Sequence, residues 1–135
     1  MTARRQATTC LVVAGLILGA CAKDEGSTEE LCAAVSEDGV STTLEGFDPT
    51  DPEAALDQLR DARVTLGDLL DAAPGEVRDD LQTEIDYVQA LVEALEGVEP
   101  GDATESALQI QAVTDAHPDV DEAAADLAAF AKERC

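Results

Sequence analysis

The feature that most constrains the fold of this chain is the spacing of its apolar residues between positions 51 and 73. Because an α-helix turns once in about 3.6 residues, alternating steps of four and three residues place apolar side chains on one face. The stretch begins at Asp51-Pro52, a typical helix start, and a proline and a glycine follow its end. It therefore predicts a helix that packs one face in a core, with this stripe: Ala55, Leu59, Ala62, Leu66, Leu69 and Ala73.

A second long helix is predicted from Glu76 to Glu96, before Gly97 and Pro100. It carries two adjoining apolar stripes, and a helix that is apolar over two stripes usually lies between two neighbours. We therefore expect it at the centre of the fold, antiparallel to the helix before it. The first stripe is Val77, Leu81, Ile85, Val88, Val92 and Leu95, and the second is Tyr87, Leu91, Ala94 and Val98.

Three shorter helices are indicated by their start signals. Ser27-Thr28-Glu29-Glu30 has the spacing of a capping box and predicts a short helix that ends at Gly39, followed by a loop over 39–50. The stretches 102–105 and 119–122 have the same spacing, with aspartate at the capping position, and His117-Pro118 separates the two helices that they open. The expected buried face of the last helix consists of Val120, Ala124, Leu127, Ala128 and Ala131.

These patterns together predict an all-α fold, a small up-down helical bundle of about four to five helices. Its core is expected to be built from small side chains, because the only aromatic residues are Phe47, Tyr87 and Phe130. Small side chains bury little area each, so a covalent cross-link matters more here than in an aromatic-rich domain.

The N-terminal segment has the composition of an export signal. Arg4 and Arg5 precede an apolar run over 11–20, which ends in Leu18-Gly19-Ala20-Cys21, the pattern of a lipobox. The run is about ten residues long, whereas a helix needs roughly 18 to cross a bilayer. We therefore predict a lipoprotein signal peptide over 1–20 that is removed, a lipidated Cys21 with a short tether over 21–28, and a helical bundle domain over 29–135. The alternative is ordinary secretion with cleavage after Ala20-Cys21-Ala22.

The remaining cysteines indicate a disulfide. Cys10 leaves with the signal peptide and Cys21 takes the lipid, so Cys32 and Cys135 remain in the mature domain. An extracytoplasmic compartment permits disulfides, and two leftover cysteines most simply pair with each other. We predict a Cys32–Cys135 disulfide with both side chains on the core side of their helices. The alternatives are two free buried thiols, or a metal site, which the absence of CxxC spacing disfavours.

The charge of the chain excludes two classes of partner. A mature chain without residues 1–20 keeps 30 acidic and six basic residues, a formal charge of −24. Nucleic acids and anionic lipid surfaces bind basic patches, so we expect no nucleic-acid partner and no peripheral binding to anionic lipid. Polar helix faces shaped by base composition or by a saline habitat explain the acidity without a partner.

No stretch of the sequence predicts catalysis. His117 is the sole histidine, and we interpret it as a half-buried, hydrogen-bonded residue at a helix end. The alternative is a surface cation site with Asp115, Asp119 and Asp121. Acidic clusters over 48–53 and 119–122 lack the spacing of an EF-hand loop, and their aspartates serve as helix caps. We predict no catalytic residue, no cofactor and no specific metal site.

The lipobox, Cys32 near the mature start, the Ala73-Pro74-Gly75-Glu76 break and Cys135 together resemble the small helical lipoproteins that are common in high-GC Gram-positive bacteria. The resemblance implies a lipid anchor on the extracytoplasmic face of the cell membrane and brings no active-site residues. The expected function is therefore a non-enzymatic interaction module that docks an envelope protein. The alternatives are a carrier or receptor for a small apolar ligand or lipid, held in a pocket near Tyr87 and Leu91, and a weak divalent-cation-responsive element.

Overall fold

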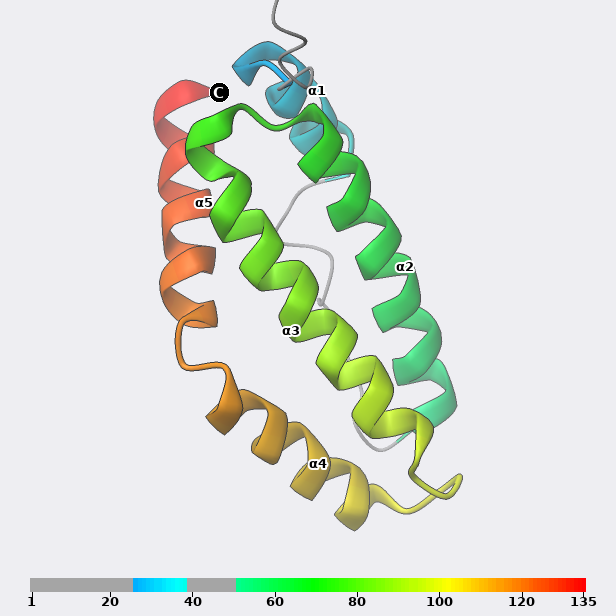
Figure 1. Ribbon diagram of the computed structural model, residues 1–135. Helices are drawn as coiled ribbons and strands as arrows, with labels where there is room; N and C mark the ends of the chain where they lie inside the picture. Colours follow the sequence, from blue (N-terminus) through cyan, green and yellow to red (C-terminus); the bar gives the residue numbers. More distant parts are fainter. Residues whose placement is uncertain (1–25, 39–50) are drawn as a thin grey trace, which may run out of the picture.

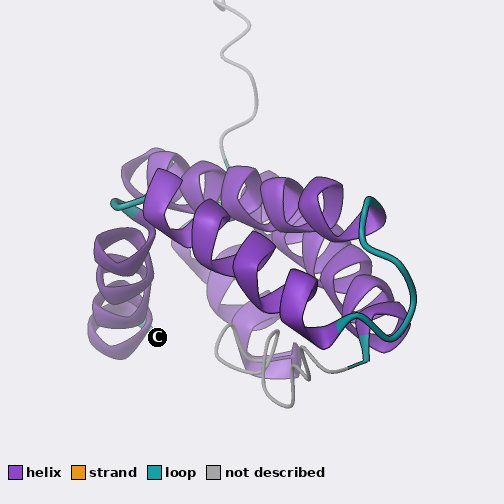
Figure 2. Ribbon diagram, turned by 90° about the horizontal axis from the view of Figure 1, so that it is seen from below, coloured by secondary structure: helices purple, strands orange, loops and turns teal. Residues whose placement is uncertain are grey.

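The computed structural model describes residues 26–38 and 51–135, and every regular element in these two ranges is helical (Figure 2). The prediction of an all-α bundle is confirmed. The predicted loop over 39–50, with Phe47, lies outside the described residues, as do residues 1–25. The elements are α1 (Thr28–Asp38), α2 (Pro52–Ala72), the 3-10 turn η2 (Gly75–Val77), α3 (Arg78–Glu96), α4 (Ala103–Ala116) and α5 (Val120–Arg134).

The long helices form antiparallel rows with α3 in the middle (Figure 1). α2 lies antiparallel along one side of α3, and α4 and α5 follow one another back along its other side. The bend between α4 and α5 falls at His117-Pro118, where His117 has left the helical conformation with φ −121° and ψ 64°. A residue before proline is disfavoured in the α conformation, which accounts for the break. The short α1 contacts α2 and α5 at the end of the bundle where α5 ends.

The core consists almost entirely of leucine, valine and alanine. All six predicted positions of α2 are buried, and both predicted stripes of α3 are buried or half-buried, which confirms the central place of α3. Tyr87 and Phe130 pack only partly against the core. The buried cluster is Leu31, Ala55, Leu59, Ala62, Leu66, Leu69, Ala73, Val77, Leu81, Val88, Leu91, Val92, Leu95 and Leu127.

The predicted buried face of α5 is partly wrong. Ala124 and Ala128 are exposed, whereas Ala123 is buried with Val120 and Leu127. α5 contains alanine on every side, so its alanines do not indicate which face is buried. The larger side chains set the rotation of the helix instead, because they gain more from leaving water.

Two of the predicted helix starts have the expected geometry in full. The Ser27 backbone N–H donates to Glu30 Oε2 over 3.0 Å and the Glu30 N–H donates to Ser27 Oγ over 3.2 Å, which is the reciprocal capping box. At α2 the Ala54 N–H donates to Asp51 Oδ1 over 3.2 Å.

Gly26 packs so closely against the backbone of Ala72 that a Cβ has no room there, so the chain just before α1 already contacts α2.

The other two predicted caps differ from each other. The Glu105 N–H donates to Asp102 Oδ1 over 3.0 Å, so Asp102 caps α4. Asp119 makes no capping hydrogen bond, and the prediction for it is wrong. Its backbone is helical, with φ −85° and ψ −7°, whereas an N-cap side chain reaches back to the helix from an extended backbone.

The link from α3 to α4 depends on a glycine. Asp102 N–H donates to the Glu99 carbonyl over 3.1 Å and closes a tight turn in which Gly101 has φ +85°. A side chain is strained at this φ, so glycine is the residue that suits the position.

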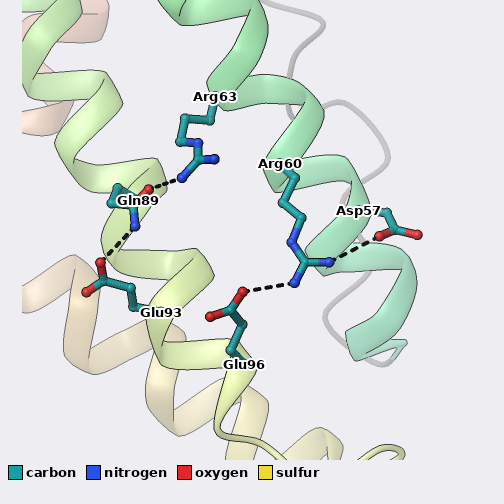
Figure 3. A network of polar contacts seen from close by, with 6 residues as sticks. All are labelled: Asp57, Arg60, Arg63, Gln89, Glu93 and Glu96. Atoms are coloured by element: carbon teal, nitrogen blue, oxygen red, sulfur yellow. Dashed lines mark hydrogen bonds and ion pairs between the residues drawn. The ribbon is translucent and has the colours of Figure 1, made fainter.

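Polar side chains join the outer faces of α2 and α3 (Figure 3). Arg60 lies 2.9 Å from Glu96 Oε1 and 3.5 Å from Asp57 Oδ1. Arg63 donates to the side chain of Gln89, which donates in turn to Glu93. These groups are largely exposed, and exposed pairs of this kind contribute little to stability.

The turn between α2 and α3 is held by a charged group. The guanidinium of Arg78 donates to the carbonyl oxygens of Leu70 over 2.6 Å and of Ala73 over 3.3 Å, and both contacts are partly buried. Carbonyls at the end of a helix lack intrahelical partners, so Arg78 satisfies part of the C-terminus of α2.

We expect Arg78→Met to lower the free energy of unfolding by about 2 kcal/mol, because hydrogen bonds to a charged group contribute about 1.5–3 kcal/mol. Methionine keeps much of the apolar stem and removes the donors. Arg63→Met is the matched control, since Arg63 donates only to the side chain of Gln89 on an exposed face. Urea denaturation measures both variants, and equal losses would contradict the proposed role of Arg78.

Candidate functional site

Cys32 and Cys135 form the predicted disulfide, which joins α1 to the residue after α5. Their Cα atoms lie 5.3 Å apart, inside the usual range for disulfides. The expectation that both cysteines face the core is wrong in part, because Cys32 is half-buried and Cys135 is exposed. Cys135 follows the last residue of α5, where its backbone N–H donates to the carbonyl of Ala131, so the cross-link lies at the end of this helix.

A small apolar cavity lies beneath this disulfide. Its volume is about 10 Å³, roughly the space that one water molecule requires. Its lining does not include Tyr87 or Leu91, where a carrier pocket was expected. The lining residues come from α1, α3 and α5 and from the disulfide itself: Leu31, Val35, Leu81, Leu127, Phe130, Ala131 and Cys135.

His117 occupies the structural position that we predicted. It is half-buried at the end of α4, and its Nδ1 lies 2.9 Å from the carbonyl oxygen of Val113. Its ring packs edge-on against Tyr87, with the centroids 5.8 Å apart, and Tyr87 Oη lies 3.1 Å from Thr114 Oγ1. These contacts tie the C-terminal end of α4 to α3.

The alternative cation site at His117 is not assembled. Asp115 accepts a hydrogen bond from Gln111 over 2.8 Å, and Asp121 lies instead beside Glu84 of α3. Within residues 26–38 and 51–135, no group of three histidine, cysteine or acidic side chains could hold a metal ion. Of the acidic stretch 48–53, the described part begins at Asp51, which caps α2.

Burial and the carboxylates of α5 raise the pKa values of two carboxylates of α3. We refer to Asp80 and Glu84 of α3 with Asp121, Glu122 and Asp126 of α5 as the acidic seam. Burial raises the pKa of Glu84, and Asp121 raises it further. Burial also raises the pKa of Asp80, with smaller effects from Asp126, Asp79 and Glu122. Glu84 Oε1 is buried without a hydrogen-bond partner.

The sequence analysis missed the acidic seam, although part of the signal was present. Asp80 and Glu84 are four residues apart, as are Glu122 and Asp126, so each pair shares one face of its helix. Whether these two faces meet depends on the rotation of α5 about its own axis. The alanines of α5 do not indicate that rotation.

α4 presents a sparsely charged face to solvent, on which Asp115 follows Gln111 by one helical turn. Ser106 is its only fully buried residue, and Leu108 is 61% exposed. In a chain with a formal charge of −22, five exposed residues on one side of this helix carry no charge. We refer to them as the α4 outer face: Thr104, Ala107, Leu108, Gln111 and Ala112.

Cys21, the predicted lipidation site, lies outside the described residues. Within the described ranges, none of the helices combines the length and the apolar character needed to cross a bilayer. Comparison of the chain with protein families, with curated proteins and with solved structures finds no match.

Proposed function

We propose that this chain is a lipoprotein anchored through Cys21 on the extracytoplasmic face of the cell membrane, where its helical domain acts as a non-enzymatic interaction module. The lipobox supports the anchor, and the Cys32–Cys135 disulfide is consistent with an oxidising compartment outside the cytoplasm.

The observation that carries the interaction role is the α4 outer face. Surfaces that become buried in a complex are depleted of charge at their centre, because unpaired charges are costly to remove from water. The α4 outer face contains an exposed leucine and borders the exposed carboxylate of Asp115, whereas α2 presents Asp57, Asp61 and Asp68 to solvent. We propose that an envelope protein with a complementary apolar surface docks on α4.

If a lipid on Cys21 holds the protein on the membrane, substitution of Cys21 should release it. Cys21→Ala should move the protein from the membrane fraction to the soluble fraction, because the thiol that receives the lipid is gone. Cys10→Ala is the matched control, since it removes a thiol within the signal segment and should leave the protein on membranes. Cell fractionation and immunoblotting measure both variants. A Cys21→Ala variant that remains in the membrane fraction would contradict the lipoprotein proposal.

The docking role is tested by site-specific photocrosslinking in intact cells of the native host. A photoreactive benzoylphenylalanine at Leu108, on the α4 outer face, should yield one dominant adduct with an envelope protein, identified by mass spectrometry. The same residue at Asp68, an exposed position of α2, is the control and should not yield that adduct. Equal labelling from both positions, or no adduct from Leu108, would contradict docking on α4.

The cavity beneath the disulfide, which is lined by described residues, does not support the carrier alternative. Most ligand pockets have volumes of about 300–1,000 Å³, and the cavity beneath the disulfide has about 10 Å³. A small apolar ligand recovered with the purified protein would favour that alternative.

A further inference from the structure

α5 is held on α3 differently at its two ends. Its C-terminal end is fixed by the disulfide at Cys135 and by an ion pair of 3.5 Å between Arg134 and Glu76. Its N-terminal half packs through Val120, Ala123 and Leu127, and the acidic seam borders this contact. One end of the helix is therefore cross-linked, while the other lies among like charges.

The described basic residues lie away from the acidic seam or are engaged elsewhere. On α2, Arg60 and Arg63 contact Glu96 and Gln89 (Figure 3). Arg78 binds the carbonyls at the end of α2. Lys132 and Arg134 lie in the last turn of α5, and Glu76 of η2 is paired with Arg134. α4 contributes His117, which packs against Tyr87.

Ionisation of Glu84 is costly. One of its oxygens, Oε1, is buried without a hydrogen-bond partner, and Asp121 of α5 lies close enough to repel its charge. A buried carboxylate without partners is costly, whereas the neutral acid is less so and gains an O–H donor.

We propose that the acidic seam makes the docking of α5 on α3 proton-dependent. When the seam carboxylates take up protons, the N-terminal half of α5 closes on α3. When they ionise, that half loosens while Cys135 and Arg134 keep the other end in place. The change acts at the bend at His117-Pro118, which is the junction between α4 and α5.

The sign of the effect follows from the pKa directions. The pKa values of Asp80 and Glu84 lie above their ordinary values of 3.8 and 4.5, so the folded state binds protons more tightly than the unfolded state. The resulting stabilisation is complete below these ordinary values and is lost as the pH rises through the raised ones. Acidification from neutral pH towards pH 5 should therefore stabilise this domain.

The first test compares thermal unfolding of the mature protein at pH 5.0 and pH 7.5, followed by circular dichroism at constant ionic strength. We expect the midpoint of the wild type to be about 4–8 °C higher at pH 5.0, the shift that about 1 kcal/mol produces in a domain of this size. Glu84→Gln should raise the midpoint at pH 7.5 and remove much of the difference between the two pH values. Glu133→Gln is the matched control, because Glu133 is exposed on α5 outside the acidic seam.

The second test locates the change by amide hydrogen exchange, corrected for the intrinsic effect of pH. Protection of Ala123 and Leu127 should increase severalfold from pH 7.5 to pH 5.0. Protection of Leu59 and Leu66 in α2 should change less. Equal effects of the Glu84 and Glu133 substitutions, or a uniform change over all helices, would overturn the proposal, because repulsion over the whole acidic surface would then explain the pH dependence.

Discussion

Cys135→Ser should lower the free energy of unfolding by about 4 kcal/mol, because the disulfide closes a loop with a sequence separation of 103 residues. In the chain-entropy model, a cross-link that closes a loop of about 100 residues stabilises by about 4.7 kcal/mol, and removal of native disulfides from small domains typically costs 2–5 kcal/mol. Because α1 has 11 residues, too few to be stable alone, we expect it to lose much of its order in the variant.

The measurement is urea denaturation of the mature protein, combined with a thiol titration in denaturant without reductant. The variant should show one reactive thiol, that of Cys32. The double variant Cys32→Ser/Cys135→Ser is the control: it lacks the same bond and should lose nearly the same free energy, without thiol-linked dimers. Two free thiols in the unreduced wild type would show that the bond is absent in the protein.

Leu59→Ala should cost about 3–5 kcal/mol, the range for leucines whose removal leaves a cavity that cannot collapse. Leu59 is 0% exposed and lies in the middle of the α2 stripe. The core around it consists of leucine, valine and alanine, so no long flexible side chain is present to fill the space.

The matched control is Leu108→Ala, which removes the same atoms from a side chain that is 61% exposed. We expect it to change the free energy of unfolding by less than about 0.5 kcal/mol, as surface substitutions usually do. Chemical denaturation measures both variants. A small loss for Leu59→Ala would contradict the packing described for α2. A domain of this size has a total stability of about 5–15 kcal/mol. The loss expected for Cys135→Ser, or for Leu59→Ala, is therefore a large part of the total free energy of unfolding.

The buried faces of the helices could be predicted wherever leucine and valine recur every three or four residues. The stripes of α2 and α3 determine which faces are buried, and the three-four spacing is sufficient to find them. The buried face of α5 was harder to predict, because exposed Ala124 and buried Ala123 are the same residue type in adjacent positions. The capping positions differ in the same way: Asp102 and Asp119 look alike in sequence, and the backbone conformation decides which one caps.

The pairing of Cys32 with Cys135 was predictable because the predicted signal peptide and lipid anchor account for the other two cysteines and leave only this pair. The exposure of Cys135 could not be predicted from the sequence, because it depends on how the end of α5 lies against the rest of the bundle. The acidic seam could not be predicted for a related reason. Helical spacing shows which carboxylates share a face, but only the packing of α5 on α3 places Asp121 beside Glu84.

The Cys32–Cys135 bond also changes the topology of the chain, because it makes residues 32–135 a closed covalent ring. A single proteolytic cut anywhere within the ring opens it but leaves both fragments attached through the disulfide. The products separate only after reduction or a second cut. If Cys21 carries the lipid, a nicked domain therefore stays tethered to the membrane in one piece, and a surface protease that cuts once does not release it.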